Sequence, residues 1–438
     1  MTDVKGRNAL SNKLYAQLEV FEAGYRSLYF HMSKLVDPRK DKGKRHKLVH
    51  ILILTVIGIL RGQTDFANMV DDLKYDEEEL TELLGLERGI PSHDTFSRVF
   101  RLIDAKEFMH AFIDWAYSYI KLQKDEHIAF DGKAVRAACD KINGGNMPYI
   151  VNSYVCGRKL VLGQLRIDSK TNEIKGIPDL IRLLDLDHCV VTIDAIGCQK
   201  EICDVIHNKN ADFVLPVKEN QKNMHKSLLL QISDQYEEWR REEAQAKEFY
   251  GKGHKNKGIK LKQPVHEIMD VYHDVDPKAE HGRKPGDRMY IVLNNTEAVN
   301  KEDWPHVKAV GMTIRKRTEI KRKNGKDISE ETTEVNTWIM SKTMSARRFG
   351  EIVRGHWRIE GSLHGVADQY FREDWCTARK DNATENLAQM RKICYNFIHL
   401  DPAVEGKSKK AAFNYYRRNT EAILKLIFEE VPMQEAGA

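Results

Sequence analysis

The sequence predicts an α/β protein in three parts: an N-terminal helical domain, a mixed sheet with its helices, and a β-rich insertion before the last helices. Three observations support this prediction. Apolar residues recur at every third or fourth position before residue 122, short apolar strands begin at 127, and apolar and polar residues alternate over much of 265–341. The 438 residues, of which 41% are apolar and 31% charged, are enough for two or three globular domains.

The N-terminal domain, residues 1–122, is predicted to be a set of short helices. We expect these helices over 8–36, 48–61, 66–74, 76–85, 89–103 and 105–121. The apolar run 48–60 is shorter than the ~20 residues that cross a bilayer, so it indicates a buried helix. Short helices with tight links can form a DNA-binding helix-turn-helix unit, and an all-helical packing domain is the alternative that stays open.

The central part, residues 123–224, alternates strands with helices. We expect strands over 127–131, 148–155, 159–167, 188–194 and 212–218, and helices over 177–186 and 198–209. The Cys156-Gly157-Arg158 link indicates a hairpin between the second and third strands, and the apolar run 188–194 indicates a strand buried on both faces. This order predicts a mixed sheet with a hairpin first and parallel crossovers after it.

The next part, residues 225–344, is predicted to be a β-rich insertion. A charged helix over 224–248 comes first, followed by alternating segments at 265–273, 288–295, 307–317 and 332–341. Asn324-Gly325 between the last two is a strong hairpin signal. Helical periodicity returns over 345–370 and 383–399, so we assign 345–400 to a second part of the core and 401–438 to a basic helical tail.

Charge and cysteine usage limit the partners and the compartment. The net charge of +5 is small, but segments 252–262 and 315–326 are strongly basic. They indicate either a surface that attracts polyanions or a pair of solvated loops. Seven cysteines without a CxxC pair fit a reducing cytosol better than a disulfide framework, and the N-terminus lacks a signal-peptide pattern. We therefore expect a cytoplasmic protein without membrane contact.

Three carboxylates are candidate metal ligands. Asp131 ends the first strand of the sheet, Asp194 ends the buried strand, and Glu360 lies on the helix after the insertion. Ligands of open α/β sheets gather at the carboxyl ends of strands, so the two aspartates can meet if their strands are neighbours. Each also has a structural interpretation, Asp131 as part of a turn with Gly132 and Asp194 as a helix N-cap.

Glu360 lies near the apolar stripe of its predicted helix at about 100° per residue, so we expect it to face partly toward the protein. Three carboxylates facing one another repel strongly, and hard divalent cations such as Mg²⁺ resolve this repulsion. Two such ions about 4 Å apart can activate a nucleophile and stabilise a leaving oxygen in phosphodiester cleavage. The three acids thus indicate a site for strand transfer in, or hydrolysis of, DNA or RNA.

A zinc site is the alternative for the same helix, since His356, Glu360 and His364 share one face. The two histidines lie about 12 Å apart along a straight helix, so both cannot bind one ion. No spaced cysteine pair supplies further ligands. Histidines that pack and hydrogen bond beside Glu360 are the favoured interpretation.

Several motifs together point to a known family. They are PSHDTFSRVF, AFDGKAVR, VTIDAIGCQKEI, ADFVLPVKENQ and HWRIEGSLH followed by FRED, and they extend from about residue 30 to 400. The chain resembles the DDE-type insertion-sequence transposases, in the branch of the H-repeat-associated proteins. The resemblance implies a ribonuclease-H-like catalytic core interrupted by the β-rich insertion, with Asp131, Asp194 and Glu360 as its acidic triad.

The resemblance also implies an activity. Two Mg²⁺ ions, or Mn²⁺ in their place, would serve the cleavage of element ends and the joining of 3′ hydroxyls to target DNA. The partners are then double-stranded DNA and a second copy of the chain, because two ends are joined, and the protein is nucleoid-associated when bound to DNA. Candidate DNA contacts, with ordinary surface placement as their alternative, are Lys133, Arg136, Lys218, Asn220, Gln221, His356, Arg358 and His364.

The chain departs from the family pattern at a few positions. Ala137 and Ala138 stand where a glycine and a small polar residue are usual, and Gly365 stands where a tryptophan is usual. None of these departures removes a candidate metal ligand. They keep two other functions open: a degenerate or co-opted DNA-binding protein without transposition activity, and a Mg²⁺-dependent DNA nuclease.

Overall fold

The computed structural model describes residues 26–138, 147–167, 173–251, 268–275, 287–323 and 326–429. Contacts between residues divide the chain into two compact units. The first consists of Met1–Gln123, Ala129–Leu184 and Arg358–Ala438, and the second of Lys124–Ile128 and Asp185–Trp357. This division cuts across the predicted segments 123–224 and 345–400. The assignment of functions to the five predicted segments stays a prediction.

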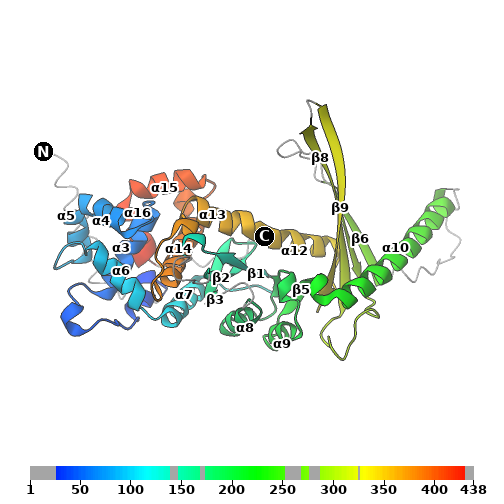
Figure 1. Ribbon diagram of the computed structural model, residues 1–438, viewed down its shortest axis with the longest axis horizontal. Coiled ribbons are helices and arrows are strands. Elements are labelled where there is room, and N and C mark those ends of the chain that lie inside the picture. Colours follow the sequence, from blue (N-terminus) through cyan, green and yellow to red (C-terminus); the bar gives the residue numbers. More distant parts are fainter. Residues whose placement is uncertain are drawn as a thin grey trace. The chain divides into compact units, whose positions relative to one another are not determined.

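The first unit begins with six short helices, which confirm the predicted helical structure within the described residues, whereas their separation as a domain stays a prediction. They are α2 (Leu28–Ser33), α3 (Leu48–Leu60), α4 (Phe66–Tyr75), α5 (Glu77–Leu84), α6 (His93–Leu102) and α7 (Ala105–Tyr119). Of the helix expected over 8–36, residues 8–25 lie outside the described residues. Every residue of α3 is buried, because α4 and α14 (Ala383–Leu400) both pack against it (Figure 1).

The apolar helix α3 was expected to be too short for a membrane span. In the part of the chain that the structure describes, no helix combines the length and the apolar character needed to cross a bilayer. The burial of α3 against neighbouring helices accounts for its apolar sequence.

The sheet of the first unit has the strand order β3-β2-β1. Its strands are β1 (His127–Ala134), β2 (Tyr149–Val155) and β3 (Leu160–Ile167). Strands β2 and β3 pair antiparallel from Tyr149 opposite Ile167 to Val155 opposite Leu160, which confirms the predicted hairpin. Helices α7, α14 and α8 (Glu173–Leu183) lie against β3. The expectation that Asp131 ends its strand is wrong, because β1 continues to Ala134.

The sheet of the second unit starts with the first two residues of β1 and continues in the order β4-β5-β9-β8-β7-β6. Backbone hydrogen bonds from Asp125 to His188 and from Val190 to Glu126 join the starts of β1 and β4. The first crossover strands are β4 (Val190–Ile193), buried throughout as expected, and β5 (Asp212–Val217). They pair in parallel, with α9 (Lys200–Asn208) between them in the chain.

The β-rich insertion continues this sheet. Helix α10 (Lys222–Gly251) leads to β6 (Met269–Val275), β7 (Asp287–Leu293), β8 (Ala309–Lys323) and β9 (Lys326–Met340). Strand β9 pairs antiparallel with β5, and β8 and β9 form a long hairpin (Figure 1). The Asn324-Gly325 turn and the basic segment 252–262 lie outside the described residues. Phe349 packs on Tyr290 and Trp338, so the core of this sheet is covered by the helix that follows it.

That helix corrects another expectation. The single helix predicted over 345–370 is three segments: α12 (Ala346–Ile359), a π-helical segment (Glu360–His364) and α13 (Gly365–Gln369). After α14, the tail forms α15 (Lys409–Arg417) and α16 (Thr420–Phe428). A π turn holds more residues than an α turn, and such segments often occur at functional sites.

Candidate active site

In the first unit, the strand that carries Asp131 meets the π-helical segment that begins at Glu360. Asp131 Oδ1 accepts a hydrogen bond from the Gly132 backbone N–H at 2.9 Å. Its other oxygen, Oδ2, lies 3.5 Å from Nδ1 of His364, the last residue of the π segment. The contact therefore joins a candidate acid on β1 to the segment that carries the second candidate acid.

The π segment is fixed by a few contacts. The Gly365 backbone N–H donates to the Glu360 carbonyl, the five-residue hydrogen bond that defines a π turn. Leu363 is buried, and the hydroxyl of Tyr395 on α14 donates to the Ser362 carbonyl at 3.0 Å. Burial raises the pKa of Tyr395 well above its usual range, so this hydroxyl keeps its proton.

The wider turn changes where Glu360 points. Its side chain is exposed, so the expectation that it faces partly toward the protein is wrong. That expectation used the 100° step of a regular α-helix, and the step does not hold where a π turn begins. An exposed carboxylate keeps its hydration, so the position of Glu360 carries no desolvation cost that a partner within the unit would have to offset.

In the second unit, Asp194 directly follows β4. Its Oδ1 accepts a hydrogen bond from the Ile196 backbone N–H at 3.1 Å and caps the 3-10 turn Ala195–Gly197. The capping interpretation therefore holds, although the capped element is this short turn and not α9.

The amide of Asn220 donates to the Ala195 carbonyl at 2.6 Å, and that of Gln221 donates to the Cys198 carbonyl at 3.1 Å. These two candidate DNA contacts thus hold the loop after Asp194, and Lys218 precedes them as a half-buried residue.

Lys133, two residues after Asp131, lies in a cluster of charged side chains in the first unit. It forms an ion pair with Asp368 and lies 3.4 Å from carboxylate oxygens of both Glu373 and Asp374. Arg136 adds a contact of 3.5 Å to Asp374. Lys133 therefore has carboxylate partners inside the chain, whereas the Arg136 side chain is 79% exposed and open to other partners.

The deepest part of this cluster is an ion pair between Glu373 and Lys392. Glu373 Oε1 accepts from Lys392 Nζ at 2.6 Å, and both side chains are at most 2% exposed. Burial alone would raise the pKa of Glu373, but the charges of Lys392, Lys133 and Arg391 outweigh it and lower this pKa to about 2. Nothing in the sequence spacing indicated this pair, because its members come from separate elements.

His356 and Arg358 have contrasting environments. His356 is 5% exposed, and its Nδ1 lies 3.0 Å from the Thr192 hydroxyl. Burial lowers its pKa to about 4, so the ring is neutral at pH 7 and presents no charge to a phosphate. Arg358, in the first unit, is exposed. Of these two candidate DNA contacts, only Arg358 has a side chain accessible to a ligand.

The candidate metal ligands are divided between the units. Asp131 and Glu360 belong to the first unit and Asp194 to the second. Among the described residues, no group of three or more histidine, cysteine, aspartate or glutamate side chains is close enough to hold a metal ion. The donor chemistry of the three acids is still that of a hard cation, because all their ligating atoms are carboxylate oxygens.

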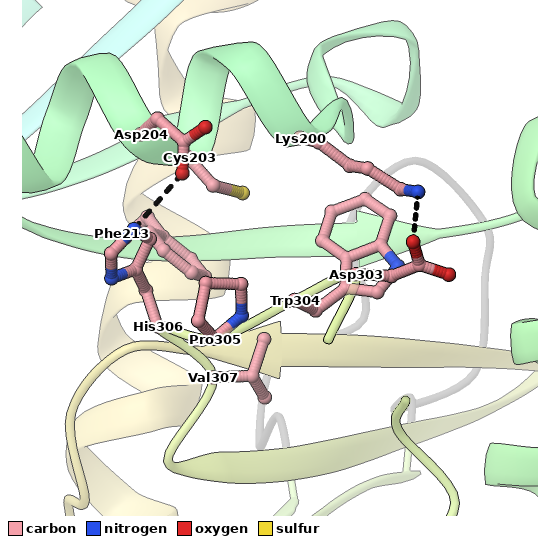
Figure 2. A pocket seen from close by; sticks show the side chains of 9 residues that line it. All are labelled: Lys200, Cys203, Asp204, Phe213, Asp303, Trp304, Pro305, His306 and Val307. Carbon is pink, nitrogen blue, oxygen red and sulfur yellow. Dashed lines mark hydrogen bonds and ion pairs between the residues drawn. The ribbon is translucent and has the colours of Figure 1, made fainter. Parts of the chain in front are cut away.

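A shallow pocket in the second unit is separate from these residues. Figure 2 shows that it lies between α9 and the loop before β8. Lys200 pairs with Asp303, and the His306 ring bonds to Asp204 at 2.9 Å. The charged side chains that line the pocket thus pair with one another. None of the candidate site residues lines this pocket.

Comparisons with known proteins agree with the motifs. The family model described as "Transposase DDE domain" matches residues 122–397, and the one described as "DDE_Tnp_1-associated" matches residues 29–116. The chain therefore belongs to the DDE transposase family. The H-repeat-associated branch, inferred from the motifs, is confirmed by the relatives.

Two of these relatives are from Escherichia coli. The putative transposase YncI of strain O157:H7 is 33% identical over 399 residues, which cover 89% of this chain and 92% of that protein. The H repeat-associated putative transposase YhhI of strain K12 is 28% identical and covers 89% and 96%, respectively. A solved piggyBac transposase synaptic complex with hairpin DNA covers 98% of this chain and 86% of its own, at 11% identity and a TM-score of 0.36. That likeness is too weak to carry an argument.

Proposed function

We propose that the protein is an active DNA transposase that cleaves the ends of its own element and joins their 3′ hydroxyls to target DNA. The observation that carries the proposal is the contact of 3.5 Å between His364 and Asp131. It joins the strand of one candidate acid to the π segment of another, within a chain of the DDE transposase family. A π segment at this point is itself typical of functional sites.

We further propose that the catalytic core is ribonuclease-H-like. Strand order β3-β2-β1 in the first unit and β1-β4-β5 in the second supports this, with β2 antiparallel to β3 and β4 parallel to β5. In such a sheet the crossover connections leave the carboxyl ends of the parallel strands available for ligands. Asp194, immediately after β4, stands at such an end.

In this proposal Asp131, Asp194 and Glu360 hold two Mg²⁺ ions, with Mn²⁺ as a substitute. When bound, the ions supply Lewis acidity toward the phosphate oxygens and lower the pKa of an attacking water or hydroxyl. The protein's part is to hold the three carboxylates oriented. The Gly132 N–H orients the carboxylate of Asp131, and the Ile196 N–H orients that of Asp194. His364 would hold Asp131 from the other side.

DNA contacts follow from exposure and charge. Arg136 and Arg358 are exposed cations near the proposed acids in sequence, and we propose that they contact the phosphate backbone. Lys218, Asn220, Gln221 and His364 stay candidates for contacts close to the acids. We leave out Lys133 and His356, because the first is engaged by carboxylates and the second is buried and neutral. Joining two element ends calls for two copies of the chain, so we propose a homodimer on DNA.

A cleavage assay on the element's own ends in Mg²⁺ tests the proposal. Asp131→Asn, Asp194→Asn and Glu360→Gln should each lower the cleavage rate at least ~100-fold, since a lost metal ligand removes several kcal/mol of charge stabilisation. Glu351→Gln is the matched control, because Glu351 is an exposed residue of α12 that pairs with Arg347 and Arg348. It should cleave at the wild-type rate.

Two outcomes would contradict the proposal. Cleavage that is unaffected by Glu360→Gln would exclude this acid from the site. Wild-type protein that binds the ends but does not cut them would favour the degenerate DNA-binding protein that Ala137, Ala138 and Gly365 keep open. For the oligomer, mass measurement of the DNA complex should give two copies of the chain, and a single copy would exclude the homodimer.

A further inference from the structure

Three buried polar side chains form one hydrogen-bonded chain in the second unit. His127 Nε2 lies 2.7 Å from the Thr192 hydroxyl oxygen, and the same oxygen lies 3.0 Å from His356 Nδ1. The residues are 7%, 1% and 5% exposed, respectively. Water cannot easily replace these contacts at such exposures, so both ring nitrogens depend on the Thr192 hydroxyl for these hydrogen bonds, and the hydroxyl depends on both rings.

Each member of this chain comes from a different element, and each element leads into one of the proposed metal ligands. His127 begins β1, four residues before Asp131. Thr192 lies on β4, two residues before Asp194, and His356 lies on α12, four residues before Glu360. A single threonine hydroxyl thus connects the three elements from which the acids follow.

The chemistry of the chain makes it directional. A hydroxyl has one hydrogen to donate and two lone pairs, and a neutral imidazole has one nitrogen that donates and one that accepts. Thr192 can therefore accept from one histidine while it donates to the other. Burial lowers the pKa of both rings, to about 3 for His127 and about 4 for His356, so both are neutral at pH 7.

Thr192 is also the polar exception in its strand. Its neighbours Val190, Val191 and Ile193 are apolar, and all four side chains of β4 are buried. A valine would fill the same volume without a hydroxyl to satisfy, so packing alone does not require a threonine here. The hydroxyl instead makes the two hydrogen bonds to the histidines.

We propose that His127, Thr192 and His356 are positioning residues, which fix the spacing of β1, β4 and α12 and thereby orient Asp131, Asp194 and Glu360 for metal binding. The proposal rests on the proposed function, because it takes those three acids as the metal ligands. None of the three positioning residues touches DNA or metal. They act through the acids, and their loss should change the affinity for metal before it changes the affinity for DNA.

Substitutions at Thr192 separate the hydroxyl from the shape of the side chain. Thr192→Val keeps the shape and removes the hydroxyl, whereas Thr192→Ser keeps the hydroxyl. Isothermal titration of Mn²⁺ into the full-length protein should show binding weakened about 10-fold or more in Thr192→Val and close to wild type in Thr192→Ser. In the cleavage assay Thr192→Val should lower kcat and leave the KM for DNA unchanged.

Two further sets of variants complete the test. His127→Gln and His356→Asn place an amide near the lost ring nitrogen and should keep more Mn²⁺ affinity than His127→Leu and His356→Leu. Thr313→Val is the matched control, because Thr313 is a buried threonine of the same unit whose hydroxyl bonds to Trp338 Nε1 at 3.3 Å. It should lower thermal stability like Thr192→Val but leave Mn²⁺ binding unchanged.

The outcomes distinguish this inference from the function on which it rests. If Glu360→Gln weakens Mn²⁺ binding while Thr192→Val does not, the positioning proposal is overturned and the proposed function stands. An equal loss of Mn²⁺ affinity in Thr313→Val would also overturn it, since general destabilisation would then explain the effect. If neither Glu360→Gln nor Asp194→Asn changes Mn²⁺ binding or cleavage, the proposed function itself fails. Should Thr192→Val not fold, the amide and leucine variants at His127 and His356 test the positioning proposal. Equal Mn²⁺ affinity in the amide and leucine variants would then overturn it.

Discussion

The two units contain buried polar clusters that are stabilised in opposite ways. In the first unit, Glu373 and Lys392 are charged and at most 2% exposed, with Lys133 beside them. In the second, His127, Thr192 and His356 are also buried but neutral. The first cluster offsets the loss of hydration with opposite charges. The second has a smaller loss, because its groups carry no charge, and offsets it with hydrogen bonds.

This difference determines what each cluster is sensitive to. Removing one member of the charged cluster leaves an uncompensated charge in a dry environment, which is costly. Removing one member of the neutral chain leaves a polar group without its partner, which costs less. The neutral chain is instead sensitive to protonation, because either ring would become a buried cation without a counter-charge among the groups that bond to it.

The largest expected effect comes from Glu373→Ala. It leaves Lys392 and Lys133 buried without their shared carboxylate, so we expect the free energy of unfolding to fall by about 3–5 kcal/mol. Denaturant unfolding, followed by hydrogen exchange of α14 peptides, measures this loss. The control is Arg101→Ala, which breaks an ion pair with Asp381 where the arginine side chain is 39% exposed, and it should cost about 1 kcal/mol or less. Equal losses in the two variants would contradict the contrast between buried and exposed pairs.

The second effect is a difference in pH response. The pKa of His356 is lowered from its usual 6.5 to about 4, so the folded state binds fewer protons than the unfolded state between these values. Stability from the neutral ring is thus present above about pH 6.5 and is lost as the pH falls toward 4, by a total on the order of 3 kcal/mol. The pKa of Glu373 is lowered from 4.5 to about 2, so its contribution is lost only between these values.

Thermal unfolding of wild type and His356→Asn between pH 7 and pH 4 tests this prediction. The amide does not titrate, so the advantage of the wild type should shrink as the pH falls. Glu373→Gln should show no such convergence until the pH is below about 4.5. A constant difference between wild type and His356→Asn over the whole range would mean that His356 does not titrate with folding.

Much of the fold could be predicted from the sequence, because its signals are local. Helix α3 and strand β4 are continuous apolar runs, and burial on all sides is what such runs indicate. The β2–β3 hairpin follows from two apolar strands joined by a short glycine-containing link. The candidate acids Asp131, Asp194 and Glu360 were also predicted from local signals, Asp194 from the end of its strand and all three from the family motifs, and their joint role stays a proposal.

Two features could not be predicted, because they depend on contacts between distant residues. The apolar period of the helix continues through Leu363 and Val366, so nothing in the sequence indicates that a π turn begins at Glu360. Likewise, Lys133 and Asp368 come from β1 and α13, and only the fold brings them together. For the neutral chain a weak signal exists: His127 and Thr192 each lie an even number of strand residues before a candidate acid, on the same side of the strand.

The smallest expected effect concerns Gly365, the residue that replaces a tryptophan of the family pattern. In the chain it stands between His356 of the neutral cluster and Asp368 of the charged one. A Cβ at this position would meet the Glu360 carbonyl oxygen at 3.3 Å, a tight but tolerable contact, whereas a Cβ at Gly361 would meet nothing within 4 Å. Alanine is favoured over glycine in a helix by up to about 1 kcal/mol.

We therefore expect Gly361→Ala to raise the free energy of unfolding by up to about 1 kcal/mol, and Gly365→Ala to change it by less, because the contact offsets the gain. Thermal unfolding of the two variants side by side measures this offset. The same contact presses on the carbonyl of Glu360, so Gly365→Ala should lower the cleavage rate although it leaves the free energy of unfolding nearly unchanged. If instead Gly365→Ala is as stabilising as Gly361→Ala and cleaves at the wild-type rate, the π turn accommodates a side chain freely, and the glycine is not needed to hold Glu360 in place.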